Sequence, residues 1–479
     1  MNLFTRCTPE EAGIPSSSVL AMIKELQEHQ VPMHSLLLAR NGKLAFEGYY
    51  APFGPGQLHR MFSISKSFTS LAIGLLERDG RISLDDPIIN YFPEYVPEHP
   101  HPWLAGMTIR DMLRMQTCHS ATTYKVNMKE NWVESFFITP PSHPSGSFFL
   151  YDTSASHTLC ALVEKLSGKP MLDYLKDTVL REIGFSEHSY FVKDPFGTSM
   201  GGSGMMAEPM DLVLVGMLLL NGGRTPDGRE LLPEAYLRQA CSLQSATAPG
   251  PSPEESCGYG YQFWRIGHNG FACYGMGGQY LICLPDQNLL CVTTADTQEF
   301  KGANQMIFNA LYRHILPSLS STPLPRDEES CRRLSEARER LSLPVLGGAL
   351  ISPAADKVQG VHYRMDQSPD VFGECYITFD SDHTGGELWY TLNGKWVSLS
   401  FGLGSLREGK FPGYDERCAC CAAWLEPDLF YLHCQLIGEC VGRVHFQIRF
   451  AENGIRVRLN KTEETYYNEY KWFLTGTAV

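Results

Sequence analysis

Residues Met61-Phe-Ser-Ile-Ser-Lys-Ser-Phe-Thr-Ser-Leu-Ala-Ile-Gly-Leu-Leu-Glu-Arg-Asp-Gly80 combine a run of apolar side chains with a serine and a lysine near its start. The apolar residues between Phe68 and Leu76 cover most of the circumference of a helix, which is typical of a helix enclosed in a core. Asp79-Gly80 provides the end of that helix. The stretch therefore predicts a buried helix with Ser63 at its amino end.

Ser63 and Lys66 lie one helical turn apart, so the lysine ammonium group can reach the serine oxygen. Free N–H groups at a helix start favour developing negative charge. A serine hydroxyl needs a neighbouring base to act as a nucleophile, and a desolvated lysine has a lowered pKa and can accept the proton. The spacing is also compatible with a serine that caps the helix and a solvated lysine, because so short a pattern arises by chance.

The composition describes a well-packed chain that is long enough for two domains. It has 479 residues, of which 43% are hydrophobic and 19% are charged. The formal net charge of −13 provides no basic surface for nucleic acid or anionic lipid. A small neutral or cationic substrate is easier to reconcile with this charge.

The amino terminus lacks the apolar segment of a signal peptide, and no later run has the length and hydropathy needed to span a bilayer. We therefore expect a cytoplasmic protein that binds a small-molecule substrate, with no nucleic acid or membrane partner and no cofactor. Self-association as a homo-oligomer is left open.

The 15 cysteines are expected to be buried thiols in a reducing compartment. Cys418-x-Cys-Cys421, with His433 and Cys434 downstream, contains residue types that bind zinc. However, neighbouring side chains of a strand point to opposite faces, so Cys420 and Cys421 are not expected to share a ligand set. We predict no metal site.

Alternating segments predict an α+β domain over residues 1–316, with an antiparallel sheet flanked by helices. Asn41-Gly42 lies between two apolar runs and is a strong signal for a β-hairpin. Helices are predicted at 9–30, around 153–168, at 203–221 and at 301–316, and strands between 259 and 294.

The remainder of the chain predicts a linker and a second domain. Residues 317–344 contain Ser, Pro and a charged run, with a helix predicted at Glu328–Leu341. From 345 to 479 the pattern is one of short antiparallel strands, which predicts a small barrel or a sandwich.

A series of short motifs follows in one order along the chain, and together they are more specific than any one of them. They are Ser63-Ile-Ser-Lys66, Ile82-x-Leu-Asp-Asp-Pro-Ile-x-x-Tyr-Phe-Pro-Glu94, Thr108-Ile-Arg-Asp-Met-Leu113, Phe149-Leu-Tyr-Asp-Thr153, Gly204-Met-Met-Ala-Glu-Pro-Met-Asp-Leu212, Gly258-Tyr-Gly-Tyr-Gln-Phe-Trp264 and Gly275-Met-Gly-Gly-Gln279. Over roughly residues 8–316 this order resembles the serine β-lactamase and penicillin-binding-protein-like family, in particular its class C-related esterase branch.

The resemblance implies a role for each matching residue. Ser63 would be the acylated nucleophile and Lys66 its proton partner. Tyr151 would act as general base, either as a phenolate or through a proton shared with Lys66. The backbone N–H groups of Ser63 and Met276 would form the oxyanion hole.

Two of the family's motifs are altered in this chain. The Tyr-x-Asn motif becomes Tyr151-Asp-Thr153, in which a hydroxyl replaces the amide that would orient a substrate carbonyl. The third motif, Lys-x-Gly or His-x-Gly, becomes Cys273-Tyr-Gly275 when the Gly-Gly-Gln that follows is the anchor. A literal His268-Asn269-Gly270 lies slightly earlier, where a hairpin turn is predicted, and this alternative register stays open.

Thr153, Cys273, Tyr274 and Gly275 are therefore candidate substrate contacts. Trp132 is a further candidate because it lies in an irregular, aromatic-rich segment, residues 119–150, and long segments without a clear period often serve function.

Loss of the third-motif cation weakens the case for substrates with a carboxylate beside the scissile bond. The resemblance implies a serine hydrolase that cleaves a small ester or amide through an acyl-enzyme on Ser63, with acyl transfer to an acceptor other than water as a variant. A catalytically silent ligand-binding or sensor protein is the alternative.

Overall fold

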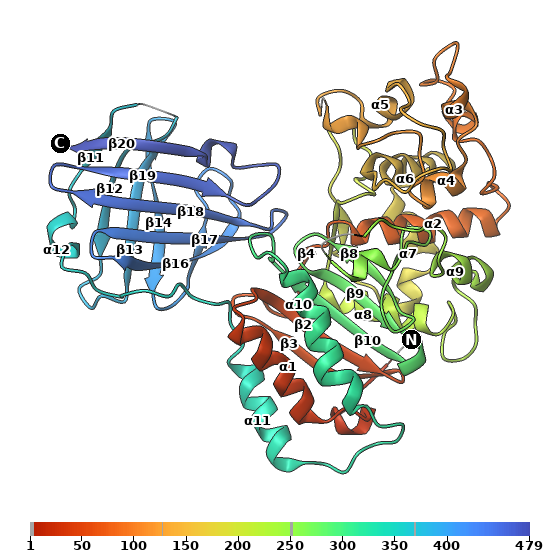
Figure 1. Ribbon diagram of the computed structural model, residues 1–479, viewed down its shortest axis with the longest axis horizontal. Helices are drawn as coiled ribbons and strands as arrows, with labels where there is room; N and C mark the ends of the chain where they lie inside the picture. Colours follow the sequence, from red (N-terminus) through yellow and green to blue (C-terminus); the bar gives the residue numbers. More distant parts are fainter. Residues whose placement is uncertain (1–3, 127, 250–251, 368–369) are drawn as a thin grey trace. The chain divides into compact units, whose positions relative to one another are not determined.

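The computed structural model describes residues 4–126, 128–249, 252–367 and 370–479. The chain divides into two compact units, one extending to Ser342 and the other beginning at Leu343 (Figure 1). Each unit has its own hydrophobic core.

The first unit is built on a mixed but mainly antiparallel sheet with the strand order β1-β3-β2-β10-β9-β8-β7. Asn41 and Gly42 have φ angles of 50° and 70°, which confirms the predicted hairpin between β2 and β3. The strands are β1 Thr5–Arg6, β2 Met33–Arg40, β3 Lys43–Tyr49, β7 Trp264–Arg265, β8 Phe271–Gly275, β9 Gln279–Leu284 and β10 Leu289–Ala295.

Helices cover both faces of this sheet, which confirms the predicted α+β class. One face packs against α1 (Ser16–Glu28), α10 (Ala303–Ala310) and α11 (Glu328–Glu339) (Figure 1). The other face packs against α2 (Ile64–Arg78) and α8 (Pro209–Leu220).

Further short elements surround α2 on its side of the sheet. The helices are α3 Pro102–Ala105, α4 Ile109–Leu113, α5 Trp132–Ile138, α6 Thr153–Ser167, α7 Met171–Thr178 and α9 Glu234–Ala240. A small sheet contains β4 His59–Arg60, β5 Tyr190–Phe191 and β6 Met205–Ala207. A capping box at Thr108 and Asp111 starts α4, as its sequence predicts.

Helix α2 is enclosed on all sides, as its sequence predicts. Every residue from Ile64 to Leu76 is buried. A Cβ at Gly74 would lie 2.5 Å from the ring of Tyr236, so α2 and α9 approach more closely than a side chain would allow. The position of α2 is therefore set from every direction by packing.

The second unit is a closed sheet with the strand order β14-β13-β12-β11-β20-β19-β18-β17-β16-β15. An additional parallel pairing between β14 and β16 closes it into a barrel, which decides between the barrel and the sandwich. Its elements are α12 Ala355–Val358, β11 Tyr363–Met365, β12 Val371–Phe379, β13 Gly385–Leu392, β14 Lys395–Leu403, β15 Arg407–Lys410, β16 Arg417–Glu426, β17 Leu429–Ile437, β18 Arg443–Ala451, β19 Gly454–Lys461 and β20 Trp472–Ala478.

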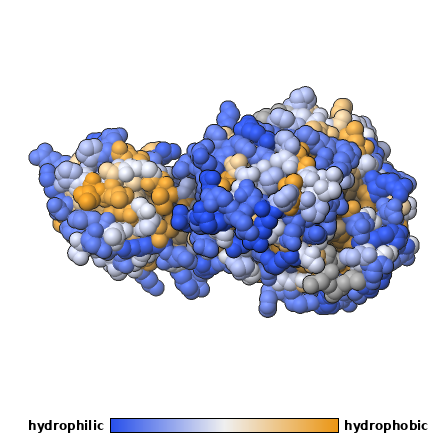
Figure 2. Space-filling model, turned by 90° about the horizontal axis from the view of Figure 1, so that it is seen from below, coloured by the Kyte–Doolittle hydropathy of each residue, from blue (hydrophilic) through white to orange (hydrophobic). Residues whose placement is uncertain are grey.

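The outer surface shown in Figure 2 is mostly hydrophilic, with apolar residues gathered over part of the second unit. No helix in the described ranges of the chain combines the length and the apolar character that crossing a membrane requires.

Residues 317–342 belong to the first unit, which corrects the prediction that 317–344 is a linker. The Ser320 carbonyl accepts a hydrogen bond of 2.7 Å from Arg40, and the N–H of Leu324 donates to the Glu10 carbonyl at 2.9 Å. Leu334 on α11 is 5% exposed and lies in the cluster that contains the apolar face of α1. The Ser, Pro and charged residues lie on the exposed face of this segment. Its few apolar side chains, such as Leu334, pack against the first unit.

Replacing Leu334 with alanine should lower the free energy of unfolding of the first unit by about 2–5 kcal/mol, the usual cost of such a truncation in a packed core. Denaturant unfolding followed by fluorescence measures this cost. The exposed neighbour Arg333 serves as control, and Arg333→Ala should change stability by less than about 0.5 kcal/mol. Equal, small effects for both variants would mean that α11 is undocked.

Candidate active site

Ser63 lies at the junction between a strained turn and the first turn of α2. Phe62 has a φ of 45°, which is unusual for a bulky residue, whereas Ser63 has helical angles. The Ser63 side chain makes no capping hydrogen bond within the described chain. Its Oγ instead accepts a hydrogen bond of 2.9 Å from Lys66 Nζ. The interpretation of Ser63 as a helix cap is therefore wrong.

Lys66 is held inside the protein. It is 1% exposed, and its Nζ donates a second hydrogen bond, of 2.6 Å, to the Gly202 carbonyl. A Cβ at Gly202 would lie 2.5 Å from the Thr153 methyl carbon and 2.9 Å from the Thr153 carbonyl oxygen. Only glycine therefore lets this carbonyl come so close to α6 and reach the lysine. The interpretation of Lys66 as a solvated side chain is also wrong.

Tyr151 contacts both members of this pair. Lys66 Nζ lies 4.8 Å from the centroid of the Tyr151 ring. Desolvation by the surrounding protein raises the pKa of the Tyr151 phenol above its ordinary value, and the Glu255 charge acts in the same direction. Hydrogen bonds with the Ser63 hydroxyl and the Trp264 side chain oppose this rise. The phenol therefore stays protonated at neutral pH while in contact with the serine.

The end of β8 lies against the turn that carries Ser63. In the described chain β7 pairs with Phe271 and Ala272, so the pairing ends before Cys273 and leaves the rest of this edge of β8 open. A Cβ at Gly275 would lie 2.4 Å from the Met61 carbonyl oxygen, two residues before the serine. The strand can approach the turn this closely because residue 275 has no side chain.

The loop after Gly275 is held by side-chain hydrogen bonds. Gln279 donates to the carbonyls of Met276 and Ala295, at 2.7 and 2.8 Å. Gly277 and Gly278 have φ angles of 82° and 92°, which favour glycine. Met276 is thus the first residue beyond the close contact between β8 and the Ser63 turn.

This arrangement matches a known protein family over most of the first unit. The model of the β-lactamase family matches residues 19–311. The chain belongs to the β-lactamase family. The wider superfamily of serine β-lactamases and penicillin-binding proteins includes the relatives described next.

One relative of this β-lactamase-family protein is a 6-aminohexanoate-dimer hydrolase from Paenarthrobacter ureafaciens. It is 22% identical over 330 residues, which cover 62% of this chain and 82% of the relative. These similarities therefore support hydrolase activity as the general class of function for this family.

Two solved structures share the fold of this family member. An octameric penicillin-binding protein homologue from Pyrococcus abyssi has a TM-score of 0.51 at 15% identity, covering 96% of this chain and 99% of its own. A penicillin-binding protein homologue from Caulobacter crescentus has a TM-score of 0.50 at 15% identity, covering 63% of this chain and 99% of its own. The first likeness extends into the second unit.

Asp152 and Thr153 occupy the altered second motif of this family member. Asp152 caps α6 by accepting a 2.8 Å hydrogen bond from the Ser154 N–H, and Thr117 donates to it at 3.2 Å. Burial raises the pKa of Asp152 to about 6. Thr153 is half-buried, and its side chain lies next to Gly202, close to the Lys66 ammonium group.

Cys273 and Tyr274 point to opposite faces of β8. Cys273 is 1% exposed and lies in the core between the sheet and α2, where burial raises its thiol pKa to about 12. Its side chain therefore has almost no surface to offer a substrate, contrary to the sequence-based assignment. Tyr274 is half-buried, and its hydroxyl donates a hydrogen bond of 2.8 Å to Glu255.

His268 and Trp132 lie in a turn and in the packed core, respectively. His268 lies in the turn between β7 and β8, with a φ of 56° and its ring 4.5 Å from that of Tyr312, as expected for a turn residue. Trp132 is 3% exposed and stacks on Tyr124 with the ring centroids 4.1 Å apart. The structure therefore places Trp132 in the packed interior, where it has almost no surface to offer a substrate.

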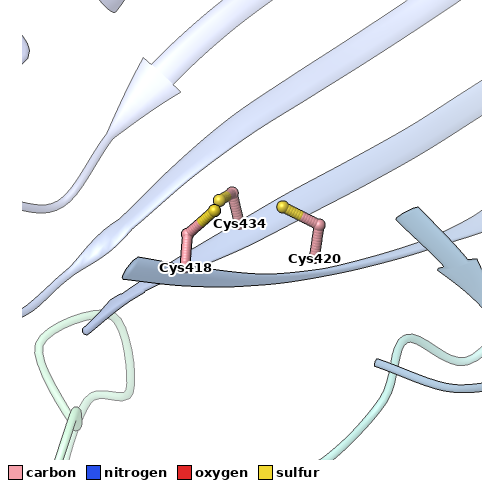
Figure 3. Close-up of side chains that lie close together, drawn as sticks. All are labelled: Cys418, Cys420 and Cys434. Atoms are coloured by element: carbon pink, nitrogen blue, oxygen red, sulfur yellow. The ribbon is translucent and has the colours of Figure 1, made fainter. Parts of the chain in front are cut away.

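One cysteine cluster has the geometry of a soft-metal ligand set. Within the described residues, the sulfur atoms of Cys418, Cys420 and Cys434 all lie within 4.8 Å of one another inside the barrel (Figure 3). Cys420 and Cys434 face each other across β16 and β17, and Cys418 shares their face. Burial raises the thiol pKa of Cys420 and Cys434, whereas hydrogen bonds from these two thiols lower the pKa of Cys418.

The Asp152 carboxyl provides a pH test of this geometry. Its folded-state pKa of about 6 lies above the ordinary 3.8, so the folded protein binds more protons between these values. The stability that this group contributes is therefore lost as the pH rises through that window. Asn preserves the helix cap but does not titrate. Between about pH 4.5 and pH 7, Asp152→Asn should gain about 2 kcal/mol of unfolding free energy relative to the wild type.

Urea unfolding at several pH values measures this gain. Asp173→Asn, at an exposed position on α7, is the control for removal of a carboxylate. A constant difference between Asp152→Asn and the wild type across the pH range would mean that Asp152 is solvated.

Proposed function

We propose that the protein is a serine hydrolase that forms an acyl-enzyme on Ser63 and cleaves a small ester or amide. The observation that carries this proposal is the 2.9 Å hydrogen bond between the buried Lys66 Nζ and Ser63 Oγ. A lysine with a purely structural role normally keeps its terminal nitrogen in solvent. Lys66 is instead buried against a serine hydroxyl that does not cap the helix, and such an arrangement is typical of a functional site.

In the first step, Ser63 Oγ bonds to the substrate carbonyl carbon and the serine O–H bond breaks. The raised pKa of Tyr151 disfavours a free phenolate, and this favours the alternative in which Tyr151 and Lys66 share the proton. In that alternative Lys66 starts as a neutral amine, accepts the serine proton directly or by way of the Tyr151 hydroxyl, and becomes an ammonium ion. The tetrahedral intermediate then expels the leaving group, which takes the proton from this pair. A water molecule repeats the sequence on the acyl-enzyme and regenerates Ser63.

The oxyanion in this proposal is bound by the N–H groups of Ser63 and Met276. The close contact between Gly275 and Met61 supports this assignment, because it brings the end of β8 to the turn that carries the nucleophile. Two rigid backbone donors would stabilise charge as it develops on the carbonyl oxygen.

The altered motifs restrict the class of substrate that the site can bind. A buried thiol replaces the third-motif cation, so no lysine or histidine at that position would meet a carboxylate. A relative named as a hydrolase of the 6-aminohexanoate dimer supports a small acyl substrate. Transfer of the acyl group to an alcohol or amine is a variant that added acceptors and product analysis would separate from hydrolysis.

Replacing Ser63 with alanine or Lys66 with methionine should each lower kcat for a small p-nitrophenyl ester by at least about 10³-fold, because each variant removes a partner of the same proton transfer. Initial rates on folded protein measure the loss. Lys165→Met changes an exposed lysine on α6 and should retain the wild-type rate.

A Ser63→Ala variant with undiminished turnover would contradict the proposal. Absence of turnover by the folded wild type across a panel of esters and amides would favour the silent-binder alternative.

A further inference from the structure

Glu255 places a carboxylate next to Tyr274, one of the candidate substrate contacts. It lies in a short turn of 3-10 helix, Glu254–Ser256, and is half-buried. Its Oε1 accepts a hydrogen bond of 2.8 Å from the Tyr274 hydroxyl, and its charge acts on the Tyr151 phenol. Among the described residues, no Lys, Arg or His forms an ion pair with Glu255. A half-buried carboxylate without a cation is uncommon, because its negative charge is only partly solvated.

Aromatic rings connect this carboxylate with the catalytic tyrosine. The Trp264 ring stacks on Tyr151 with a centroid separation of 5.6 Å, and its centroid lies 5.9 Å from that of Tyr274. Tyr259 packs edge-on against Trp264, with the ring centroids 4.9 Å apart, and is 1% exposed. It therefore holds the Trp264 ring in place from the buried side. Tyr151, Trp264 and Tyr274 all retain exposed surface.

Aromatic faces combined with a carboxylate are the groups that bind an organic ammonium ion. The negative faces of the rings attract a cation, and the carboxylate adds a full charge in a partly desolvated setting. The same surroundings disfavour a substrate carboxylate, which would meet Glu255 without the family's third-motif cation. The charge of this side of the site is thus inverted relative to the family's pattern.

We propose that the substrate carries an ammonium group, which binds between Glu255 and the rings of Trp264 and Tyr274 while its ester or amide carbonyl lies at Ser63. This inference rests on the proposed acyl-enzyme function and adds the substrate class, a cationic ester or amide. A competing explanation is that Glu255 only holds Tyr274 in place. That structural role predicts an equal effect on neutral and cationic substrates.

Two p-nitrophenyl esters of equal shape separate these explanations. One is the ester of γ-trimethylammoniobutyrate, and the other is its neutral analogue, in which a tert-butyl group replaces the trimethylammonium group. The wild type should hydrolyse the cationic ester with a kcat/KM at least about tenfold higher, and Glu255→Gln should remove most of this preference. The readout for Glu255→Gln is the ratio of the two kcat/KM values, because loss of the Glu255 charge also lowers the pKa of Tyr151 and can change the rate for both esters.

Asp286→Asn is the matched control, since it removes one negative charge from the turn at the opposite end of β9 from Met276. It should leave both rates unchanged. The wild-type preference should also fall as salt is raised from about 20 mM to about 500 mM, because salt screens the interaction. This readout needs no variant and holds even if Glu255→Gln folds poorly.

Equal kcat/KM values for the two esters in the wild type would overturn the inference, as would equal losses for both esters in Glu255→Gln. In either case acylation of Ser63 by the neutral ester would leave the proposed function intact. If neither ester is hydrolysed and Ser63 is not acylated, the proposed function itself fails.

Discussion

The hydrogen bond between Lys66 and Ser63 depends on keeping the Lys66 amino group inside the protein. Burying such a polar nitrogen is costly unless hydrogen bonds compensate it, and here Ser63 Oγ and the Gly202 carbonyl accept two of them. The surrounding structure serves this requirement. α2 is packed on every side, so neither the lysine nor the serine can move away by shifting the helix.

Glycines allow the backbone to close around this pair. Gly202 brings a carbonyl to Lys66, Gly275 brings the end of β8 to the nucleophile turn, and Gly74 lets α2 pack against Tyr236. In each case a Cβ would lie closer to its neighbour than atoms normally approach. The site is therefore assembled by close backbone contacts between elements that are distant in sequence, and its geometry is as rigid as the core.

Local signals predicted much of this fold. The buried run after Phe68 predicted α2, and Asn41-Gly42 predicted the first hairpin, because both patterns act over a few residues. The direction of Cys273 was not predicted, since it depends on which face of β8 meets α2. Trp132 was assigned as a candidate substrate contact because an irregular segment does not reveal its packing. The Gly202 contact likewise requires the tertiary structure.

The barrel offers a similar lesson about register. Cys418 and Cys420 share a face because strand side chains alternate, and this much follows from the sequence. That Cys434 joins them depends on the pairing of β16 with β17, in which Cys420 lies opposite Cys434. The adjacent Cys421 instead pairs with His433 on the other face. Short-range alternation is therefore predictable, whereas the partner across the ladder is not.

Mass analysis after treatment with a fluorophosphonate shows whether Ser63 is the nucleophile, because this reagent phosphonylates serines activated by a neighbouring base. We expect a single adduct on the peptide that contains Ser63 in folded protein, and a much slower reaction in Lys66→Met. Folded wild-type protein that takes up no label at Ser63, or that is labelled at another serine instead, would contradict this expectation.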